Sequence, residues 1–241
     1  MCQKENTVTS YKNIVVLTGA GVSAESGVAT FRDNGGLWEQ HRMEDVATPE
    51  AFARDPELVQ NFYNMRRAQL ASVEPNAAHS ALGLLEAKFD GHVTIVTQNV
   101  DNLHERGGSE TVIHMHGELT KVRCSYCSGI FQWQVDCTQA SQCPSCFNQP
   151  SLRPHIVWFG EMPFEMDHIE SLLRACDLFI SIGTSGSVYP AAGFVSLVRS
   201  LGRAHTIEVN LEPSDGASYF AETRHGKAGE LVPLLVDELL V

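Results

Sequence analysis

The sequence lacks the features typical of nucleic-acid-binding and membrane-spanning proteins. Its 241 residues include 17 Lys and Arg against 29 Asp and Glu, so the formal net charge is −12 and no basic stripe is available for phosphate backbones. No apolar run approaches the roughly 18 residues that suggest a membrane-spanning helix. We therefore expect neither nucleic acid nor a membrane as a partner, whereas an acidic surface favours lysine-rich protein ligands.

Targeting segments and repeats are missing as well. Residues 1–6 have no apolar signal core and no Arg-rich transit character, so we expect a cytoplasmic protein. No internal repeat or low-complexity tract is evident. The length fits a single α/β domain that carries small insertions. The oligomeric state stays open, a monomer included.

Four of the seven cysteines have the spacing of zinc ligands. Cys124 and Cys127 form one C-x-x-C pair, and Cys143 and Cys146 form a second pair after fifteen intervening residues. Two pairs complete a tetrahedron without another ligand, which is typical of a closed structural zinc site. Two disulfides are the competing interpretation, and the lack of an export signal favours zinc. We expect ordinary thiols at the three other cysteines: Cys2, Cys137 and Cys176.

A glycine-rich turn follows the first apolar run of the chain. Residues 13–17 predict a buried parallel strand, and the turn Gly19-Ala20-Gly21-Val22-Ser23-Ala24 comes directly after them. We expect the turn to lead into a helix whose free N–H groups hold a pyrophosphate. A dehydrogenase would then continue into a second strand with an acidic residue about 20 positions on. A polar loop, 31–36, follows instead, and we expect a flexible loop that covers the cofactor.

Apolar strands alternate with helical stretches over the rest of the chain. Strand patterns occupy 92–97, 177–182 and 205–209, and a helix is predicted over 75–89. This alternation predicts a doubly wound, Rossmann-like parallel sheet, whose ligands collect at the carboxyl ends of its strands. Polar motifs follow three of the strands, and we expect them to share one site: Gln98-Asn99-Val100-Asp101, Gly183-Thr184-Ser185-Gly186-Ser187 and Asn210.

One predicted helix carries a tyrosine and an arginine on a common face. Asp55 before Pro56 predicts the N-cap and first residue of a helix that reaches about residue 71. Tyr63 and Arg66, at positions i and i+3, lie beside its apolar stripe. From the pattern alone they are a half-buried tyrosine and a solvated arginine. The predicted apolar stripe consists of Leu58, Phe62 and Met65.

The motifs and their order resemble those of the sirtuins, the NAD-dependent protein-lysine deacylases, over nearly all of the chain. The turn at Gly19 matches the family's cofactor motif. Residues 97–104, Thr-Gln-Asn-Val-Asp-Asn-Leu-His, match the segment that holds nicotinamide and its ribose, and His116-Gly117-Glu118 matches the catalytic-histidine motif. One departure is Ala29, where many sirtuins have proline, and it should loosen the cofactor loop.

The resemblance implies roles for the matched residues. His116 is the implied general base, a role that suits an imidazole because its pKa of about 6.5 lies near working pH. Asn99 and Asp101 are implied to orient nicotinamide and water, and zinc to be structural. NAD contacts are implied at Gly19, Ala20, Gly21, Ala24, Phe31, Arg32, Gln98, Asn99, Asp101, Gly183, Thr184, Ser185, Asn210 and Ala228. Substrate contacts are implied at Ala47, Tyr63, Arg66, Val157, Phe159, Gly160 and Glu161.

A smaller motif bears on the acyl group. Tyr63-x-x-Arg66 is similar to the Tyr-x-x-Arg of the sirtuin subgroup, class III, that removes succinyl, malonyl and related acidic acyl groups, and Ala47 matches the small residue that widens its acyl pocket. The resemblance therefore implies that Tyr63 and Arg66 bind the acyl group, in place of a half-buried tyrosine and a solvated arginine. It implies acylated-lysine proteins as partners and removal of acetyl as well as acidic acyl groups. The implied products are free lysine, nicotinamide and O-acyl-ADP-ribose.

The resemblance also implies one catalytic domain over residues 1–241. Two alternatives for its activity stay open. One is a sirtuin-like ADP-ribosyltransferase, which would pass ADP-ribose to a protein side chain, and the other is a noncatalytic NAD-sensing or zinc-mediated interaction module. The expected parts are a Rossmann-like NAD-binding part at 10–33, 76–120 and 152–241, a helical acyl-pocket module at 34–75, and a zinc ribbon at 121–151.

Overall fold

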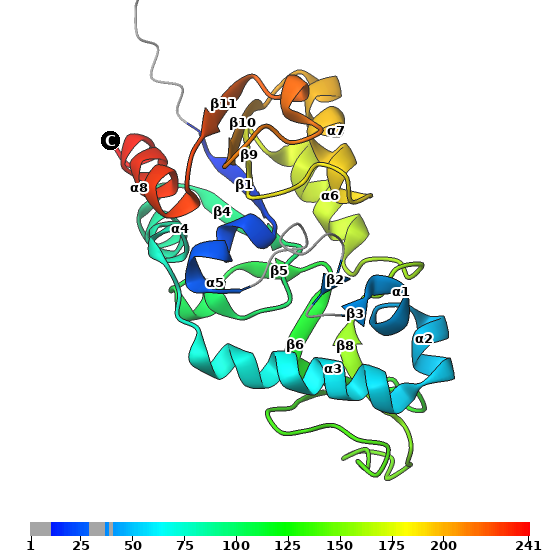
Figure 1. Cartoon of the computed structure of the whole chain (residues 1–241). Coiled ribbons are helices and arrows are strands. Elements are labelled where there is room, and N and C mark those ends of the chain that lie inside the picture. Colours follow the sequence, from blue (N-terminus) through cyan, green and yellow to red (C-terminus); the bar gives the residue numbers. More distant parts are fainter. Residues whose placement is uncertain (1–10, 29–36, 39–40) are drawn as a thin grey trace, which may run out of the picture.

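The computed structural model describes residues 11–28, 37–38 and 41–241. Its larger part is a six-stranded sheet in the order β11-β10-β9-β1-β4-β5, in which every recorded pairing is parallel (Figure 1). The predicted doubly wound α/β sheet is confirmed. The strands are β1 (Asn13–Thr18), β4 (His92–Thr97), β5 (Val112–His114), β9 (Leu178–Ile182), β10 (His205–Asn210) and β11 (Glu222–His225).

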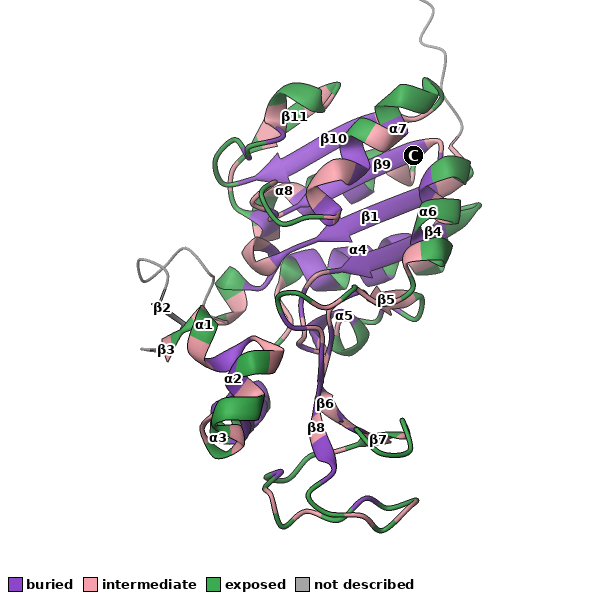
Figure 2. Ribbon diagram, turned by 90° about the vertical axis from the view of Figure 1, so that its right-hand side faces the viewer, coloured by how far each residue is buried: buried purple, intermediate pink, exposed green. Residues whose placement is uncertain are grey.

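Strand β1 lies inside the sheet and is buried on both faces (Figure 2). Because side chains alternate along a strand, Ile14 and Val16 pack into one hydrophobic layer and Val15 and Leu17 into the other. Burial on both faces explains why this strand reads as a continuous apolar run. The first layer is covered by α4 (Ala77–Lys88) and α8 (Ala228–Leu239), and the second by α6 (Met166–Ala175) and α7 (Phe194–Leu201).

A smaller antiparallel sheet and a group of helices extend from the parallel sheet (Figure 1). The longest of these helices, α3 (Pro56–Gln69), crosses the small sheet and its loops and is joined to them by polar contacts. Gln60 Nε2 donates to the carbonyl of Leu152 at 3.1 Å, and Arg67 Nε donates to that of Leu119 at 2.8 Å. The remaining strands and helices are β2 (Leu37–Trp38), β3 (His41–Arg42), α1 (Met43–Val46), α2 (Pro49–Arg54), α5 (Leu103–Arg106), β6 (Gly117–Cys124), β7 (Ile130–Gln132) and β8 (Leu152–Ile156).

Helix α3 begins as predicted, but its buried face differs from the prediction. Asp55 caps the helix by accepting a hydrogen bond from the backbone N–H of Leu58 at 3.0 Å. Met65, predicted in the apolar stripe, is 50% exposed. Phe62 is buried and Leu58 packs against the same cluster, so the apolar spacing was wrong at Met65. The helix also buries polar side chains against the small sheet. The buried stripe at i, i+3, i+4, i+7 is Val59, Phe62, Tyr63 and Arg66.

The turn after β1 does not lead into the expected α-helix. Two short 3₁₀ helices, Ala20–Val22 and Ala24–Ser26, stand in its place. The backbone of Gly21 instead packs against that of Gly183, and its N–H donates to the Gly183 carbonyl at 2.9 Å. A Cβ on Gly21 would lie 2.7 Å from the Gly183 Cα. In the described residues between β1 and β4 no strand joins the large sheet, as the missing dehydrogenase pattern predicted.

The four paired cysteines converge at the far end of the small sheet. All four Sγ atoms lie within 4.8 Å of one another, and the Cys124–Cys146 and Cys127–Cys143 separations are 3.7 Å. A tetrahedral zinc ion with Zn–S bonds of about 2.3 Å needs thiolates about 3.8 Å apart. The geometry and the donor set therefore fit zinc, and the disulfide alternative is wrong because all four thiols are free.

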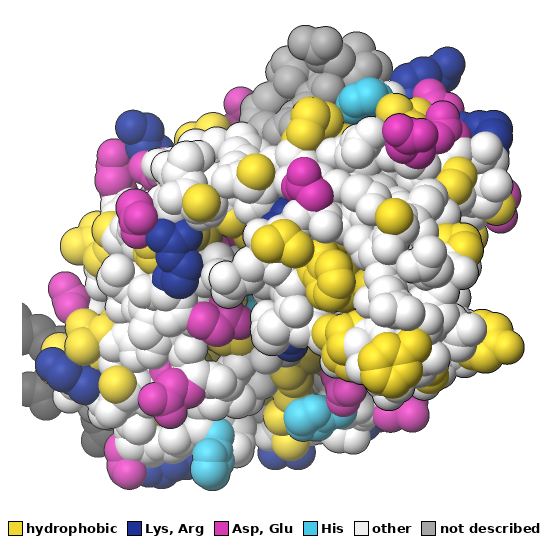
Figure 3. All heavy atoms as spheres, turned by 90° about the horizontal axis from the view of Figure 1, so that it is seen from below, with side chains coloured by type: hydrophobic (Ala, Val, Ile, Leu, Met, Phe, Trp, Pro, Cys, Tyr) yellow, Lys and Arg dark blue, Asp and Glu magenta, His cyan; other side chains and the backbone are white. Residues whose placement is uncertain are grey.

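The other cysteines stay apart from this cluster. Cys137 and Cys176 are free, buried thiols, as predicted, and Cys2 lies outside the described residues. Among the helices of the described chain, none is long and apolar enough to cross a membrane. Figure 3 views the molecule from the small-sheet end and shows hydrophobic side chains gathered on that face. Four exposed side chains of this region are apolar: Tyr126, Ile130, Val135 and Phe147.

We expect Gly21→Ala to destabilise the fold, because the added Cβ forces the turns after β1 and β9 apart. Overpacking of this kind costs about 1–3 kcal/mol, which urea denaturation measures. Gly193→Ala is the matched control, since its Cβ would meet nothing closer than 3.6 Å. Equal stabilities of the two variants would contradict the packing argument.

Replacing both Cys124 and Cys127 by serine should abolish zinc binding and lower the melting temperature, because metal binding and folding are coupled at a closed site. The measurements are metal content by mass spectrometry and thermal unfolding. Cys176→Ser is the control: this buried thiol lies outside the cluster and should leave one zinc per chain. A stable double variant without zinc would refute the structural role of the metal.

Candidate functional site

The polar motifs of the sequence meet at the carboxyl edge of the large sheet. The Asn99 side chain, after β4, reaches the turn after β1 and donates to the carbonyl of Gly19 at 3.2 Å. That turn in turn meets the loop after β9 through the Gly21–Gly183 contact. Three strand ends are thus joined by hydrogen bonds. The structure therefore brings the predicted polar motifs together at this edge.

The same row of contacts continues to β10 and α8. Asn210 Nδ2 donates to the carbonyl of Thr184 at 2.7 Å, and the Asn210 carbonyl accepts from the N–H of Gly226 at 3.0 Å. Ala228 is the first residue of α8 and is 9% exposed. Ser185 follows Thr184 in the loop after β9, and its carbonyl accepts from a backbone N–H of the loop after β10. The predicted NAD-contacting residues Gly183, Thr184, Ser185, Asn210 and Ala228 therefore lie on neighbouring segments of this edge.

A buried four-residue network lies where the turn meets the segment after β4. Ser23 Oγ is its centre: it accepts from Asn99 Nδ2 at 3.1 Å and donates to Asp101 Oδ2 at 3.2 Å. His79 Nε2 lies 3.3 Å from the same hydroxyl. His79 Nδ1 accepts the N–H of Asn76, so its Nε2 carries the proton and donates to Ser23. The network is therefore fully paired with a neutral His79, and burial lowers the pKa of His79 to about 4.

Neither Ser23 nor His79 was predicted as a site residue. The sequence shows Ser23 as a polar residue of the glycine-rich turn, but it does not show that Ser23 is buried against Asp101. His79 belongs to a capping box with Asn76 at the start of α4, a pattern that can be found in the sequence. Asp101 also accepts the N–H of Leu103 at 3.1 Å, and burial raises its pKa.

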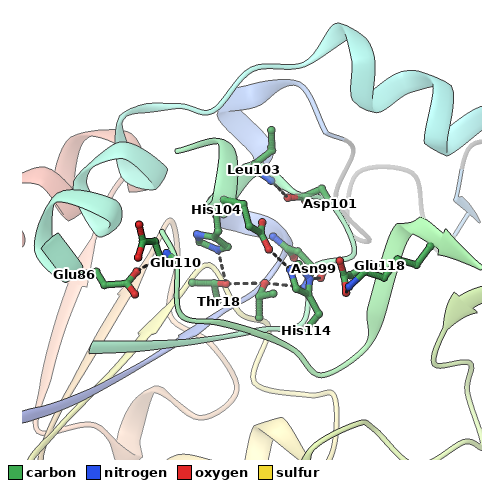
Figure 4. Close-up of polar contacts among 12 residues, drawn as sticks. Thr18, Glu86, Asn99, Asp101, Leu103, His104, Glu110, His114 and Glu118 are labelled. Carbon is green, nitrogen blue, oxygen red and sulfur yellow. Dashed lines mark hydrogen bonds and ion pairs between the residues drawn. The ribbon is translucent and has the colours of Figure 1, made fainter. Parts of the chain in front are cut away.

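A second set of buried hydrogen bonds joins Asn99 to Thr18 and His104 (Figure 4). The Asn99 N–H donates to Thr97 Oγ1 at 3.0 Å, which also accepts from Thr18 Oγ1 at 2.8 Å. His104 Nε2 lies 2.9 Å from the Thr18 hydroxyl. Because that hydroxyl gives its proton to Thr97, His104 Nε2 is the donor. Burial lowers the pKa of His104 to about 3, so the ring is neutral.

His116 is half-buried and presents one free ring nitrogen. Its Nδ1 lies 3.1 Å from the Gln98 carbonyl, which is an acceptor only, so Nδ1 carries the proton. Burial lowers the pKa of His116 below its usual value. Nε2 then has a lone pair near neutral pH and can accept a proton. The His116 carbonyl accepts the N–H of Val157 at 2.9 Å, which joins the segment after β8 to this histidine.

The predicted acyl-pocket residues gather in a second cluster beside Trp158. Trp158 Nε1 donates to the hydroxyl of Tyr63 at 2.9 Å, and the N–H of Phe159 donates to the carbonyl of Ala47 at 3.0 Å. Tyr63 and Arg66 are 1% and 6% exposed, so the expectation of a solvated arginine, drawn from the pattern alone, is wrong. Burial raises the pKa of Tyr63, and the Trp158 hydrogen bond and the Arg66 charge oppose that rise.

Glu161 differs from the other predicted substrate residues because its carboxylate faces the protein. It accepts hydrogen bonds from both terminal nitrogens of Arg153 at 2.7 and 3.0 Å, from Arg123 at 2.9 Å and from the N–H of Trp158 at 2.9 Å. Phe159 is 51% exposed and Gly160 has φ +90°, so the tip of this loop faces solvent.

A pocket opens beside the same edge, between the end of β9 and α7. Gln98, Ser181 and Thr184 supply part of its polar lining, and Leu17 and Val188 part of its apolar lining. At the turn itself, Ala20 and Gly21 are half-buried and Ala24 is exposed. The implied contacts Phe31 and Arg32, like Ala29 and the predicted covering loop 31–36, lie outside the described residues.

Comparisons with known proteins agree with this arrangement. The model of the Sir2 family matches residues 19–190. The chain is 62% identical over 232 residues to an NAD-dependent protein deacylase of Vibrio vulnificus, which covers 95% of this chain and 94% of that one. It is 40% identical to a solved Sir2 homologue in complex with NAD, with a TM-score of 0.86 and coverage of 95% and 90%.

A more distant solved structure is that of a Sir2 protein with a p53 peptide and NAD⁺. It shares 27% identity with this chain, with a TM-score of 0.80 and coverage of 95% and 93%. The family match spans more than half of the chain, and the relatives cover nearly all of it. The chain therefore belongs to the Sir2, or sirtuin, family.

Proposed function

We propose that this chain removes acetyl and acidic acyl groups from protein lysines, with NAD as co-substrate. The general activity, that of an NAD-dependent protein deacylase, follows from the family and from relatives that share about three fifths of the residues of this chain. The observation that carries the proposal about the acyl group is that the segment after β8 contacts both sites: Val157 donates to the His116 carbonyl, and Trp158 donates to the Tyr63 hydroxyl. Arg66 is buried on the same helix as Tyr63, three residues further on.

The carboxyl edge fits NAD in the chemistry of its donors. The turn after β1 and the loop after β9 approach closely because they carry glycine, and a phosphate can reach their backbone. Gln98 lines the neighbouring pocket and supplies an amide for ribose hydroxyls. Asn210 and Ala228 hold the far end of the row, where we place the adenosine. The proposal also includes three parts of the chain: a Rossmann-like part that binds NAD, a helical module that forms the acyl pocket, and a zinc ribbon.

Cleavage of its nicotinamide bond lets NAD supply an electrophilic ribose carbon, which the acyl oxygen of the substrate captures. The chain's own residues prepare that step. Asn99 and Asp101, fixed by Ser23, orient nicotinamide and a water. His116 holds its Nδ1 proton against the Gln98 carbonyl, and its Nε2 takes the proton of a ribose hydroxyl. The zinc cluster, with four protein thiolates, has no open position for substrate.

Arg66 is the residue that we assign to the acidic acyl group. Its side chain lies on the buried face of α3, and its guanidinium carbon is 5.9 Å from the ring centroid of Phe62. A guanidinium in apolar surroundings binds a carboxylate through two charge-assisted hydrogen bonds. Ala47 leaves room beside this face, and the Tyr63 hydroxyl offers a further polar group. Glu161 supports the substrate loop through its arginine pairs rather than by touching substrate.

The direct test is a mass-spectrometric panel of acetyl-, succinyl- and malonyl-lysine peptides with and without NAD. The proposal expects loss of all three acyl masses only with NAD, together with nicotinamide and O-acyl-ADP-ribose. Release of nicotinamide without an acylated peptide, with ADP-ribose added to a protein, would identify the transferase instead. No turnover of any peptide would leave the noncatalytic module.

His116→Tyr should leave a folded, zinc-loaded protein and remove NAD-dependent deacylation, because the proton acceptor is lost while the cysteine cluster is untouched. Positioned acid–base catalysis contributes roughly 10²–10⁴-fold. In the unmodified protein, kcat/KM should fall as the pH drops through the pKa of His116, which lies below its usual value. Near-normal turnover by the variant would exclude His116 as the base.

Arg66→Met should damage desuccinylation selectively. Losing charge-assisted hydrogen bonds of about 1.5–3 kcal/mol lowers kcat/KM on the order of 10- to 100-fold for a succinyl peptide, whereas an acetyl methyl has no acceptor to lose. The measured quantity is the ratio of kcat/KM for matched succinyl and acetyl peptides. Arg54→Met, at an exposed arginine of α2, is the control.

Tyr63→Phe should act in the same direction, with an added loss of stability because Trp158 Nε1 loses its acceptor. Stability is therefore measured for both variants. If Arg66→Met lowers both reactions equally, Arg66 supports the fold or the cofactor, and the acidic-acyl assignment is wrong.

A further inference from the structure

Three consecutive carbonyls after β4 are each held by a donor from residues 114–119. The Gln98 carbonyl accepts from His116 Nδ1, and the Val100 carbonyl accepts from the N–H of Leu119 at 2.8 Å. The carbonyl between them, that of Asn99, lies 3.3 Å from His114 Nδ1. Figure 4 shows His114 beside Asn99. The segment that carries Asn99 and Asp101 is thus positioned along its length by this neighbouring stretch of chain.

His114 differs from His116 in what its second nitrogen meets. His114 Nε2 lies 2.6 Å from Oε1 of Glu105, a residue of the helical turn α5, and the His114 side chain is only 7% exposed. The Asn99 carbonyl accepts hydrogen bonds only, and so does an ionised carboxylate. Both contacts are hydrogen bonds together only when both ring nitrogens carry protons, that is, in the imidazolium form. The contact with Glu105 is then a charge-assisted hydrogen bond.

The surrounding charges agree with this protonation. Glu105 on α5 and Glu118 on β6 raise the pKa of His114 against the effect of burial, and the His114 contact lowers the pKa of Glu105. Lys121 on β6 pairs with Glu118 at 2.5 Å, and its charge also lowers the pKa of Glu105. Two further titratable groups interact with His114. Asp101 comes from the segment after β4, and His104, whose ring is neutral, comes from α5.

We propose that His114 and Glu105 form a positioning pair for the deacylation reaction: the protonated imidazole ties the Asn99 carbonyl to α5 and thereby holds Asn99 and Asp101 in place. The inference rests on the proposed function. The charge of His114 also acts on Asp101: it lowers the pKa of the Asp101 carboxyl, which burial raises. Deprotonation of His114 leaves one of its two contacts unmade, so the segment is held less firmly.

Two histidines two residues apart therefore give the reaction opposite dependences on pH. His116 must be neutral to accept a proton, and His114 must be protonated to hold its two acceptors. We expect a bell-shaped profile of kcat/KM for NAD, which reports groups of the free enzyme. Its acid limb belongs to His116 and its alkaline limb to His114. Acetyl-lysine peptide is the substrate, because its acyl group does not titrate.

The test is Glu105→Gln in the full chain, assayed from about pH 5.5 to pH 9.5 around the histidine range. Removing an opposite charge at this distance changes a pKa by one or more pH units. The alkaline limb should therefore move to lower pH, with about a tenfold loss of kcat/KM at its foot, and the acid limb should stay. Glu86→Gln is the matched control: Glu86 fastens the backbone of Glu110 and Thr111 before β5 without touching His114.

His114→Gln is the second variant, since it retains a donor for the Asn99 carbonyl and cannot become charged. It should lower kcat/KM across the range and remove the alkaline limb. Proton NMR of the imidazole should show His114 titrating above His116 in the unmodified protein. An alkaline limb that is absent, or that is unchanged in both variants of the pair, overturns the inference. That outcome differs from failure of the proposed function, in which the unmodified protein turns over no acylated peptide.

Discussion

The close approach of two glycine turns is the constraint on which the site depends. Gly21 and Gly183 meet backbone to backbone, and any side chain at either position would collide with the other turn. This contact places the ends of β1 and β9 side by side and fixes the edge to which Asn99 and Asn210 attach from opposite sides. Glycines usually assigned to phosphate binding therefore have a prior role here, because without them the donors of the edge would not converge.

The zinc cluster acts on this edge through the strands that it terminates. β6 begins at Gly117, directly after His116, and ends at Cys124, while β8 runs back towards Val157. The ribbon therefore fixes the spacing between His116 and the loop that carries Trp158 and Phe159. Helix α3 is tied to the same ribbon by Gln60 and Arg67, which sets the place of Tyr63. The cysteine cluster thus helps to determine where Tyr63 and Trp158 lie relative to His116.

Much of the fold could be predicted from local sequence patterns, because each pattern is caused by a local constraint. The buried run 14–17, the Asp55 cap and the C-x-x-C pairs each identify one element or site. The face of α3 could not be predicted in the same way: Asn64 and Arg67 are buried against partners far along the chain, and their polarity hides that burial from an apolar count. The 3₁₀ turns after β1 result from contact with Gly183, more than 150 residues away.

The buried network at the edge was hidden for a related reason. Ser23 and His79 are ordinary in isolation, and only their convergence on Asn99 and Asp101 shows that they fix those side chains. Hydrogen-bond direction then follows from chemistry: the Asn76 N–H can only donate, so His79 Nδ1 accepts, and the Ser23 proton is left for Asp101. The protonation of each of these side chains is thus set by its partners in the fold.

The same reasoning separates the two histidines beside the segment after β4. His114 and His116 both donate Nδ1 to one of its carbonyls, and burial disfavours a charge on both. Glu105 decides the difference, because it adds an acceptor and a negative charge to one ring only among the described contacts. In our proposal the first imidazole is charged and ties the segment to α5, whereas the second is neutral and its Nε2 keeps a lone pair. A single carboxylate beside one of two neighbouring histidines thus gives the two rings different protonation preferences.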